Sequence, residues 1–162
     1  MEIRRAVETD LPALMDIYEE ARQFMRAHGN QEQWSGGYPQ KEILLADIAA
    51  GCLYVCEEDQ KIGAVFFYRV GEDPTYRVIE QGSWKNDNTY GTIHRVASDG
   101  TIKGVFSQIV SFCEVICPEL RADTHKDNNV MQHLFEKNGF ERCGVIYVEN
   151  GTPRFAYQRC AR

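Results

Sequence analysis

A short segment in the middle of the chain has the residue types of an anion-binding loop. Tyr90 to Ala97 fits a strand, and Ser98-Asp99-Gly100 has the composition of a turn, because Gly and Asp tolerate unusual backbone angles. Lys103 and Gly104 follow, immediately before a helical pattern of apolar residues. The first turn of a helix leaves backbone N–H groups without partners inside the helix, and these groups attract anions. The segment therefore predicts a site for a phosphate or pyrophosphate.

The same loop differs from two common nucleotide-binding motifs. A Walker P-loop has a Lys-Ser or Lys-Thr pair at its end, and no such pair follows Gly104. A dinucleotide-binding fingerprint has three glycines at a fixed spacing, which is missing here. The loop alone therefore indicates an anion site without naming the ligand.

Composition limits the class of protein. A length of 162 residues fits one domain with a proper core, so we expect a single domain over residues 1–162. Hydrophobic residues make up 43% and charged residues 26%, as in ordinary globular proteins. The net charge of −6 argues against a nucleic-acid partner. Because no apolar run is long enough to span a membrane and no signal-peptide pattern is present, we expect no membrane partner and a cytoplasmic location.

The six cysteines are expected to be reduced thiols rather than disulfides or metal ligands. Two pairs share a C-x3-C spacing, Cys52 with Cys56 and Cys113 with Cys117. Neither pair resembles a zinc knuckle, and no paired histidine motif completes one. Cysteine is also common as a small apolar residue in protein cores. We therefore expect no metal site.

Hydrophobic periodicity indicates the elements that precede the loop. A strand over Glu2–Ala6 leads to a helix that Thr9 or Asp10 caps and that ends near His28-Gly29-Asn30. The elements expected next are a loop over Gln31–Pro39, a helix over Glu42–Ala50, and an antiparallel hairpin of Cys52–Glu57 and Ile62–Val70. A long connection over Gly71–Thr89 is ambiguous and is expected to hold a short helix or strand around Arg77–Glu80.

The elements after the loop complete a mixed α/β pattern. A strand over Leu120–Thr124 precedes a helix over Asn128–Asn138, with Gly139 as its stop. The residues of this helix expected to face inward are Val130, Met131, Leu134 and Phe135. Phe140–Val148 and Arg154–Arg159 are expected to be strands, joined through the turn signal Asn150-Gly151. The whole order is β-α-α-β-β-β-α-β-α-β-β.

This order, with these residues, resembles the GNAT superfamily of acyl-CoA-dependent N-acyltransferases over essentially the whole chain. The opening Ile3-Arg4-Arg5-Ala6 and Asp10-Leu11-Pro12-Ala13-Leu14 resemble the family's first strand and helix. Leu134-Phe135-Glu136-Lys137-Asn138-Gly139-Phe140, preceded by Asp127-Asn128, is similar to the family segment ending L-Y-E-K-x-G-F. The family's pyrophosphate signature, Q/R-x-x-G-x-G/A, falls on Thr101–Phe106.

Three positions depart from the family pattern. Thr101 replaces the usual Arg or Gln, and Phe106 replaces a small residue, so Gly104 alone keeps the signature. Phe135 stands where the family often has a tyrosine that is thought to protonate the departing CoA thiolate. Phenylalanine cannot donate a proton, and Tyr147 is one conceivable replacement.

The resemblance implies a fold and a donor substrate. The GNAT fold is mixed α+β, with a central twisted, mostly antiparallel sheet, a parallel strand pair at the cofactor cleft, and four helices. Acetyl-CoA would be the acyl donor and an unidentified amine the acceptor, and a homodimer stays open. The residues implied in acetyl-CoA binding are Val96 along the pantetheine arm, the amides of Lys103, Gly104, Val105, Phe106 and Ser107 at the pyrophosphate, and Asn128.

Direct attack of a primary amine on the thioester would require a base. His94 is the first candidate, because it lies two residues before Val96 on the same strand face and an imidazole titrates near neutral pH. Glu80 and Asp123 are further candidates. The alternative for His94 is a packed strand histidine, and for the two acids a solvated surface position. His125 and His133 are expected to be exposed.

Aromatic residues in the two irregular segments are candidates for the acceptor site. Trp34, Tyr38, Tyr76 and Trp84 would suit an acceptor with an apolar or cationic group, although each could equally fill the core. We expect an acetyl-CoA-dependent N-acetyltransferase acting on a small molecule or a peptide. Two alternatives stay open: a non-catalytic acyl-CoA-binding module, and an unrelated nucleotide-binding protein that ATP or NAD would stabilise.

Overall fold

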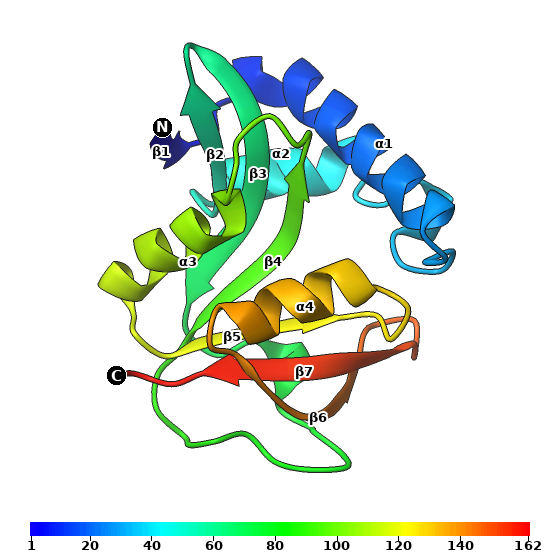
Figure 1. The fold of residues 1–162 in the computed structure, drawn as a ribbon, viewed down its shortest axis with the longest axis vertical. Coiled ribbons are helices and arrows are strands. Elements are labelled where there is room, and N and C mark those ends of the chain that lie inside the picture. Colours follow the sequence, from blue (N-terminus) through cyan, green and yellow to red (C-terminus); the bar gives the residue numbers. More distant parts are fainter. The chain divides into compact units, whose positions relative to one another are not determined.

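The computed structural model describes residues 1–162, and its element order matches the predicted one (Figure 1). The strands are β1 (Glu2–Arg5), β2 (Leu53–Glu58), β3 (Lys61–Val70), β4 (Gly91–Ser98), β5 (Leu120–Thr124), β6 (Glu141–Tyr147) and β7 (Pro153–Arg159). The α-helices are α1 (Leu11–Ala27), α2 (Lys41–Ala49), α3 (Val105–Ile116) and α4 (Asn129–Lys137). Three single-turn 3₁₀ helices lie at Glu8–Asp10, Ser35–Gly37 and Pro74–Tyr76.

The seven strands have the sheet order β1-β2-β3-β4-β5-β7-β6. Pairing is mostly antiparallel, and the one parallel pair joins β4 to β5, with Gly91 opposite Leu120 and Thr92 opposite Arg121. This confirms the predicted fold class. The chain divides into two compact units, residues 1–68 with 94–109 and residues 69–93 with 110–162.

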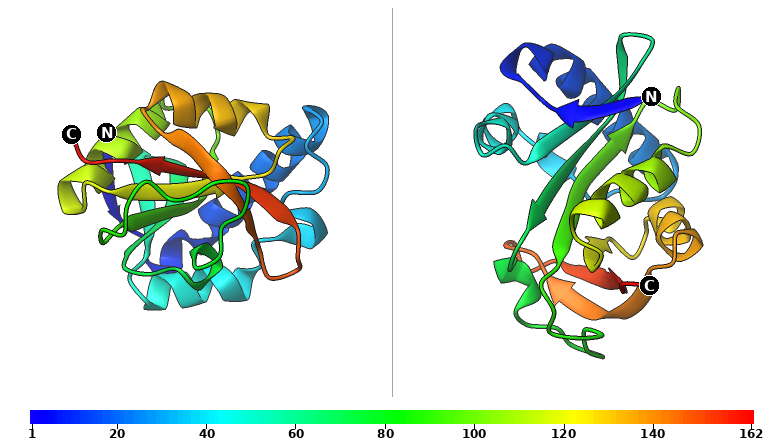
Figure 2. Two further views of the ribbon diagram at one scale, coloured as in Figure 1. Left: turned by 90° about the horizontal axis from the view of Figure 1, so that it is seen from below. Right: turned by 90° about the vertical axis from the view of Figure 1, so that its left-hand side faces the viewer.

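In the first unit, α1 and α2 pack against the sheet (Figure 2). Leu14 and Tyr18 of α1 are completely buried against sheet residues that include Val55 and Val65. The hairpin of β2 and β3 turns through Asp59 and Gln60, both with positive φ. Two successive residues of this kind form the turn whose twist matches that of paired strands.

An ion-pair cluster fixes the entry to α1. Arg4 donates to both carboxylate oxygens of Asp10, at 2.8 and 3.0 Å, and to Glu57 at 2.9 Å. Asp10 also accepts the Val7 backbone N–H at 2.8 Å. Asp10 is the N-cap residue of α1, as predicted, but its side chain makes no hydrogen bond to α1 and holds the preceding turn instead. The Arg4 guanidinium lowers the pKa of Asp10.

In the second unit, α4 packs on β7, and the connection after β3 packs on β6 and β7 (Figure 2). Glu80 forms an isolated antiparallel bridge with Val145 of β6. Gly82 and Gly144 make this approach feasible: a Cβ on Gly82 would lie 1.9 Å from the Cys143 carbonyl oxygen, and one on Gly144 would lie 2.5 Å from that of Glu80. The predicted element around Arg77–Glu80 is therefore this bridge, while the 3₁₀ turn lies earlier.

Two predictions about exposure near α4 were wrong. His125 is 1% exposed, because the chain leaving β5 turns back on its ring, whose Nδ1 accepts the Asp127 backbone N–H at 3.0 Å. Val130 is 45% exposed, because it lies in the first turn of α4 on the side away from Phe135, which is buried. His133 is exposed, as predicted.

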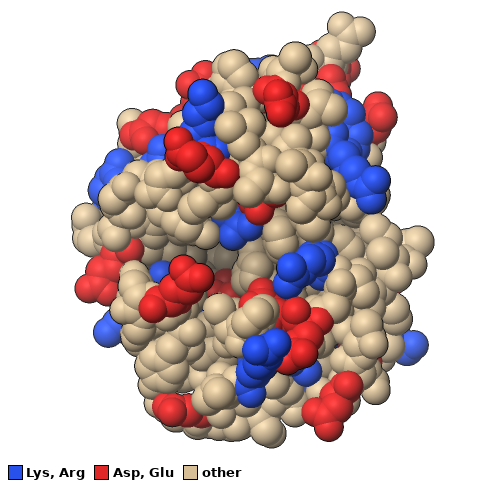
Figure 3. Space-filling model, turned by 180° about the vertical axis from the view of Figure 1, so that it is seen from behind, with Lys and Arg blue, Asp and Glu red and all other residues tan.

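Charges of both signs are distributed over the surface. Lys and Arg side chains are interspersed with Asp and Glu over the face in Figure 3. No helix combines the length and apolar character needed to cross a membrane.

All six cysteines are free thiols; Cys160 is exposed, Cys52 is half-buried and the other four are buried. No three His, Cys, Asp or Glu side chains are grouped so that they could hold a metal ion.

Candidate active site

Strand β4 contains one residue in the left-handed backbone region. Arg95 has a φ of 50°, which residues other than glycine rarely adopt. The buried hydroxyl of Tyr18, from α1, donates to the Arg95 backbone carbonyl at 2.7 Å and so holds this irregular segment. Strict alternation of faces does not continue through such a residue. His94, Arg95 and Val96 are accordingly all half-buried.

The Arg95 side chain makes an ion pair in the first unit. Its Nε and Nη2 donate to one oxygen of Asp47, from α2, at 3.1 and 2.7 Å, and its Nη1 donates to the Tyr38 hydroxyl at 3.1 Å. The guanidinium carbon lies 4.6 Å from the centre of the Phe67 ring. Burial raises the pKa of Asp47, although Arg95 opposes this shift. The pair thus fixes a charged network beside β4.

His94 lies next to this network. Its ring centre is 5.8 Å from that of Phe67, the ring that the Arg95 guanidinium also contacts. Trp34 packs edge-on against Tyr18, with ring centres 5.5 Å apart. The structure therefore brings three predicted site residues, His94, Tyr38 and Trp34, to one region of the first unit.

A buried arginine holds the loop that carries two of these residues. Arg22 of α1 is 6% exposed and donates to the backbone carbonyls of Gly37 and Tyr38, at 3.4 and 3.0 Å. Glu19 balances its charge at 2.7 Å. Because Arg22 fixes the loop backbone, the position of the Tyr38 ring is fixed by α1 rather than by the loop alone.

The predicted anion-binding loop has a rigid start. The Asp99 carboxylate accepts from the Thr101 N–H at 2.9 Å and from its hydroxyl at 2.6 Å. Asp99 also donates its N–H to the Gly63 carbonyl of β3 at 3.0 Å. Gly63 allows this contact, because a Cβ there would lie 2.8 Å from the side chains of Thr101 and Ile102. Asp99 and Thr101 thus order the start of the loop.

The end of the loop is open at its glycine. Gly104 has a φ of 63°, and no heavy atom lies within 4 Å of the place where its Cβ would be. Lys103 and Ser107 are exposed, whereas the Val105 and Phe106 side chains are buried. Any contribution of Val105 and Phe106 to an anion site therefore comes from their backbone.

The α4 residues have defined structural contacts. The Asn128 side chain accepts the Met131 N–H at 3.0 Å and so caps α4. Phe135 is 2% exposed, and its ring centre lies 4.9 Å from that of Tyr157. The Tyr157 hydroxyl is buried without a hydrogen-bond partner, and burial raises its pKa. The tyrosine whose ring contacts Phe135 is therefore Tyr157 of β7.

The other acid–base candidates lie in the second unit. Glu80 is exposed and accepts a hydrogen bond from the Tyr147 hydroxyl at 3.1 Å. Asp123, on β5, accepts from the buried Tyr76 hydroxyl at 2.7 Å, and burial raises the pKa of Tyr76 well above its ordinary value. Tyr147, the conceivable replacement for the missing tyrosine, thus contacts Glu80.

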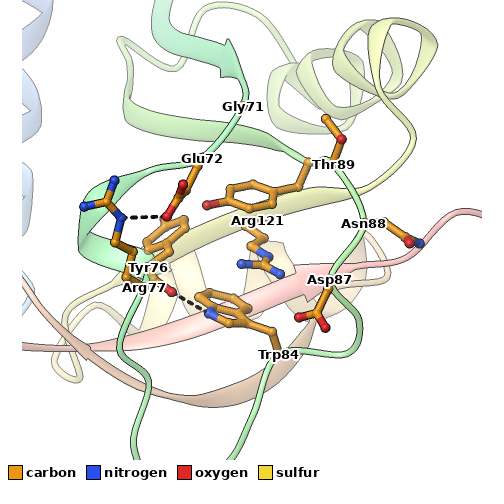
Figure 4. Close-up of a pocket in the computed structure, with 10 residues that line it drawn as sticks. Gly71, Glu72, Tyr76, Arg77, Trp84, Asp87, Asn88, Thr89 and Arg121 are labelled. Carbon is orange, nitrogen blue, oxygen red and sulfur yellow. Dashed lines mark hydrogen bonds and ion pairs between the residues drawn. The ribbon is translucent and has the colours of Figure 1, made fainter.

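Trp84 and Tyr76 line a cavity of about 400 Å³ in the second unit (Figure 4). The Trp84 indole N–H donates to the Tyr76 carbonyl at 2.9 Å. Trp84 also stacks on Arg121, whose guanidinium carbon lies 4.1 Å from the ring centre. The predicted acceptor aromatics thus fall into two groups, Trp34 with Tyr38 in one unit and Tyr76 with Trp84 in the other.

The residues that sequence reasoning missed are Tyr18, Asp47, Arg95 and Arg121. Asp47 and Arg95 are charged residues inside apolar patterns, and this was the one signal that could have marked them. No local sequence pattern distinguishes Tyr18, because it belongs to a regular helical pattern of apolar residues. No local pattern predicts that Trp84 stacks on Arg121 either.

Solved structures with similar folds identify the family. An acetyltransferase of the GNAT family from Streptococcus agalactiae 2603 is 30% identical, with a TM-score of 0.90, and the match covers 99% of this chain and 95% of that one. A Staphylococcus aureus Mu50 protein described as an acetyltransferase is 24% identical, with a TM-score of 0.70 and complete coverage of both chains. A ribosomal-protein-alanine N-acetyltransferase from Brucella melitensis is 20% identical, with a TM-score of 0.64 and 99% coverage of each chain.

Comparisons by sequence gave no match, either among protein-family models or among curated proteins. The structural relatives are sufficient to identify the family, because one of them combines 30% identity with coverage of nearly the whole of both chains. The chain belongs to the GNAT family of acetyltransferases. By this membership it has the fold of an N-acetyltransferase enzyme.

Proposed function

We propose that this enzyme transfers the acetyl group of acetyl-CoA to a primary amine of a small molecule or peptide, by direct attack, with His94 as the base. The observation that carries the proposal is the position of His94. It is half-buried beside Phe67, next to the fixed Arg95–Asp47 pair, in the region that also holds Tyr38 and Trp34. A titratable group held beside a charged network is suited to proton transfer.

The loop before α3 fits the pyrophosphate of acetyl-CoA. Open space faces Gly104, the first turn of α3 follows it, and Lys103 adds an exposed positive charge. Backbone N–H groups can bind phosphate whatever their side chains, so the buried Phe106 ring does not exclude this site. Val96 on β4 would lie along the pantetheine arm, in the same unit as the loop.

Each residue of the first unit has a distinct part in the proposed reaction. Acetyl-CoA supplies an activated acyl carbon, whose C–S bond breaks as the new C–N bond forms. His94 accepts the proton that the amine nitrogen loses. Tyr18 holds β4 at Arg95, and Arg22 holds the loop of Tyr38, so both are positioning residues. Tyr38 and Trp34 would line the acceptor side.

The rival function is an acyl-CoA-binding module without catalysis. One observation favours it: Phe135 cannot protonate the departing thiolate, and the nearby Tyr157 hydroxyl is buried. Under the proposed mechanism this proton comes from the His94 imidazolium or from water.

Release of the CoA thiol in the presence of amines separates the two functions. We expect acetyl-CoA to raise the melting temperature and thiol release to rise with the concentration of at least one amine among alkylamines, amino acids and lysine peptides. Binding of acetyl-CoA without amine-dependent release across the panel would establish the module.

A matched pair of variants tests the donor site. Asp and Asn both tolerate the left-handed backbone of Gly104, and they differ by one negative charge. We expect Gly104→Asp to bind acetyl-CoA roughly tenfold more weakly than Gly104→Asn, a difference of about 1.4 kcal/mol, because the carboxylate repels the pyrophosphate. Equal affinities for two equally stable variants would refute the assignment of this loop.

A further inference from the structure

Arg121 is a buried cation without a carboxylate partner. It lies on β5 and is 5% exposed. Its guanidinium carbon is 4.1 Å from the Trp84 ring centre and 3.9 Å from that of Tyr90, so two aromatic rings contact it. Its Nη2 donates to the backbone carbonyl of Asn86 at 2.9 Å, and its Nε is buried without any hydrogen-bond partner.

The Tyr90 side chain also hydrogen-bonds to Arg121, but no carboxylate pairs with it, so the charge of Arg121 is incompletely compensated. Buried charges in proteins are normally paired and hydrogen-bonded, because burial removes their hydration. Two other buried arginines, Arg22 and Arg159, each pair with a glutamate. Cation–π contacts stabilise Arg121 but supply no counter-ion. Burial therefore lowers the pKa of Arg121.

The cavity of about 400 Å³ gives a small molecule room beside Arg121 (Figure 4). Planar carboxylates bind arginine through the N–H groups at the edge of the guanidinium, and such an edge contact is compatible with the two rings that already touch Arg121. Two acids also line the cavity: Glu72 pairs with Arg77 at 2.6 Å, whereas Asp87 is exposed and forms no ion pair. Their charge disfavours polyanions such as phosphates and is compatible with a single carboxylate.

We propose that this cavity binds the carboxylate group of a small organic molecule, with Arg121 as its counter-ion and Trp84 as one wall. The site is built entirely from residues of the second unit, so it does not depend on the assignment of His94 or of the loop before α3. The carboxylate could belong to the amine acceptor itself or to a separate ligand, and the two sources are distinguished below.

Tryptophan fluorescence offers a direct test in the full chain. Trp34 and Trp84 are the two tryptophans, so Trp34→Phe leaves Trp84 as the sole reporter, stacked on Arg121. Benzoate and benzamide have nearly the same shape and differ in charge. We expect benzoate to change the Trp84 emission saturably and to raise the melting temperature, and benzamide to do neither. No saturable change with benzoate, or equal changes with both, would overturn the proposal.

A matched pair of substitutions tests whether benzoate binding depends on Arg121. Arg77 also lines the cavity but is largely exposed, so Arg77→Lys is the control for Arg121→Lys. Lysine keeps the charge but loses the planar fork and the stacking. We expect at least tenfold weaker benzoate binding in Arg121→Lys and unchanged binding in Arg77→Lys; equal binding in a folded Arg121→Lys would contradict the site. If Arg121→Lys does not fold, the comparison of benzoate with benzamide decides.

The KM of amines in the acetyl-transfer assay shows whether the carboxylate belongs to the acceptor or to a separate ligand. If the cavity holds the acceptor, benzoate raises the KM of amines that carry a carboxylate and leaves that of other amines unchanged. If it holds a separate ligand, benzoate binds without raising the KM of either kind of amine.

Discussion

At the scale of single residues, the region around β4 depends on polar groups held in apolar surroundings. Tyr18 bonds the Arg95 carbonyl, and Asp47 pairs with the Arg95 guanidinium. Removing one member of such a pair leaves the other charge buried without compensation, which typically costs about 3–5 kcal/mol. The exact placement of His94 is thus set by neighbours that do not react.

His94→Gln tests the base. We expect the variant to keep its fold and to lose the limb of the pH–rate profile that falls in the neutral range, because glutamine cannot take up a proton there. His133→Gln, an exposed position on α4, is the control and should retain the wild-type profile. If the pH–rate profile of His94→Gln superimposes on that of the wild type, His94 is not the base and only packs within the structure.

Local sequence patterns revealed some of these residues and could not reveal others. Lys103 and Gly104 were found because turn chemistry and helix starts are local. The positive φ of Arg95 depends on its contact with Tyr18, which lies 77 residues away in the chain. The stacking of Trp84 on Arg121 likewise joins distant segments. Such contacts come from the tertiary fold and leave no periodic signal.

At the scale of elements, the cluster of Arg4, Asp10 and Glu57 ties β1 to β2 and to the turn before α1. Arg4 lowers the pKa of Asp10 below its ordinary value of 3.8, so folding favours the ionised carboxylate. This contribution to stability is present above that value and is lost as pH falls through the folded-state pKa.

Asp10→Asn should therefore destabilise the protein by about 1–3 kcal/mol at pH 7, and by much less in acid, where wild-type Asp10 is itself protonated. Asp59→Asn, at an exposed turn position that asparagine tolerates, should change stability little at any pH. Urea unfolding of the three proteins between pH 3 and pH 7 measures the difference. A destabilisation that does not depend on pH would mean that the Asp10 charge contributes nothing.

Element boundaries were predictable where periodicity was strong. The helix expected over Glu42–Ala50 lies at Lys41–Ala49, and the strands expected after α4 differ by one residue at most ends. The connection over Gly71–Thr89 was not predictable, because Gly82 and Gly144 signal nothing by themselves. Their meaning lies in the contact between the connection and β6.

At the scale of the whole molecule, the two compact units share continuous elements. The division falls within β3, within β4 and within α3. Separating the units would interrupt the hydrogen bonding of a helix and the regular course of two strands. We therefore expect the chain to unfold as one cooperative unit, which is also the single domain that its length predicts.

Each unit contains one tryptophan, Trp34 in the first and Trp84 in the second. In Trp34→Phe and Trp84→Phe, the remaining tryptophan reports on one unit, while far-UV circular dichroism reports on all helices and strands. We expect the two probes to give the same urea midpoint within each variant. Different midpoints within one variant would show that the units unfold separately.

The exposed thiol of Cys160 has a practical consequence for enzymology. A disulfide reagent that counts released CoA would also react with this cysteine, and would therefore add a signal from the protein to the signal from turnover. The four buried cysteines would follow only as the protein opens. Without reductant, two chains could also become covalently joined through Cys160 and imitate a stable dimer. A Cys160→Ser chain would therefore be the suitable background for kinetics and for measurements of mass in solution.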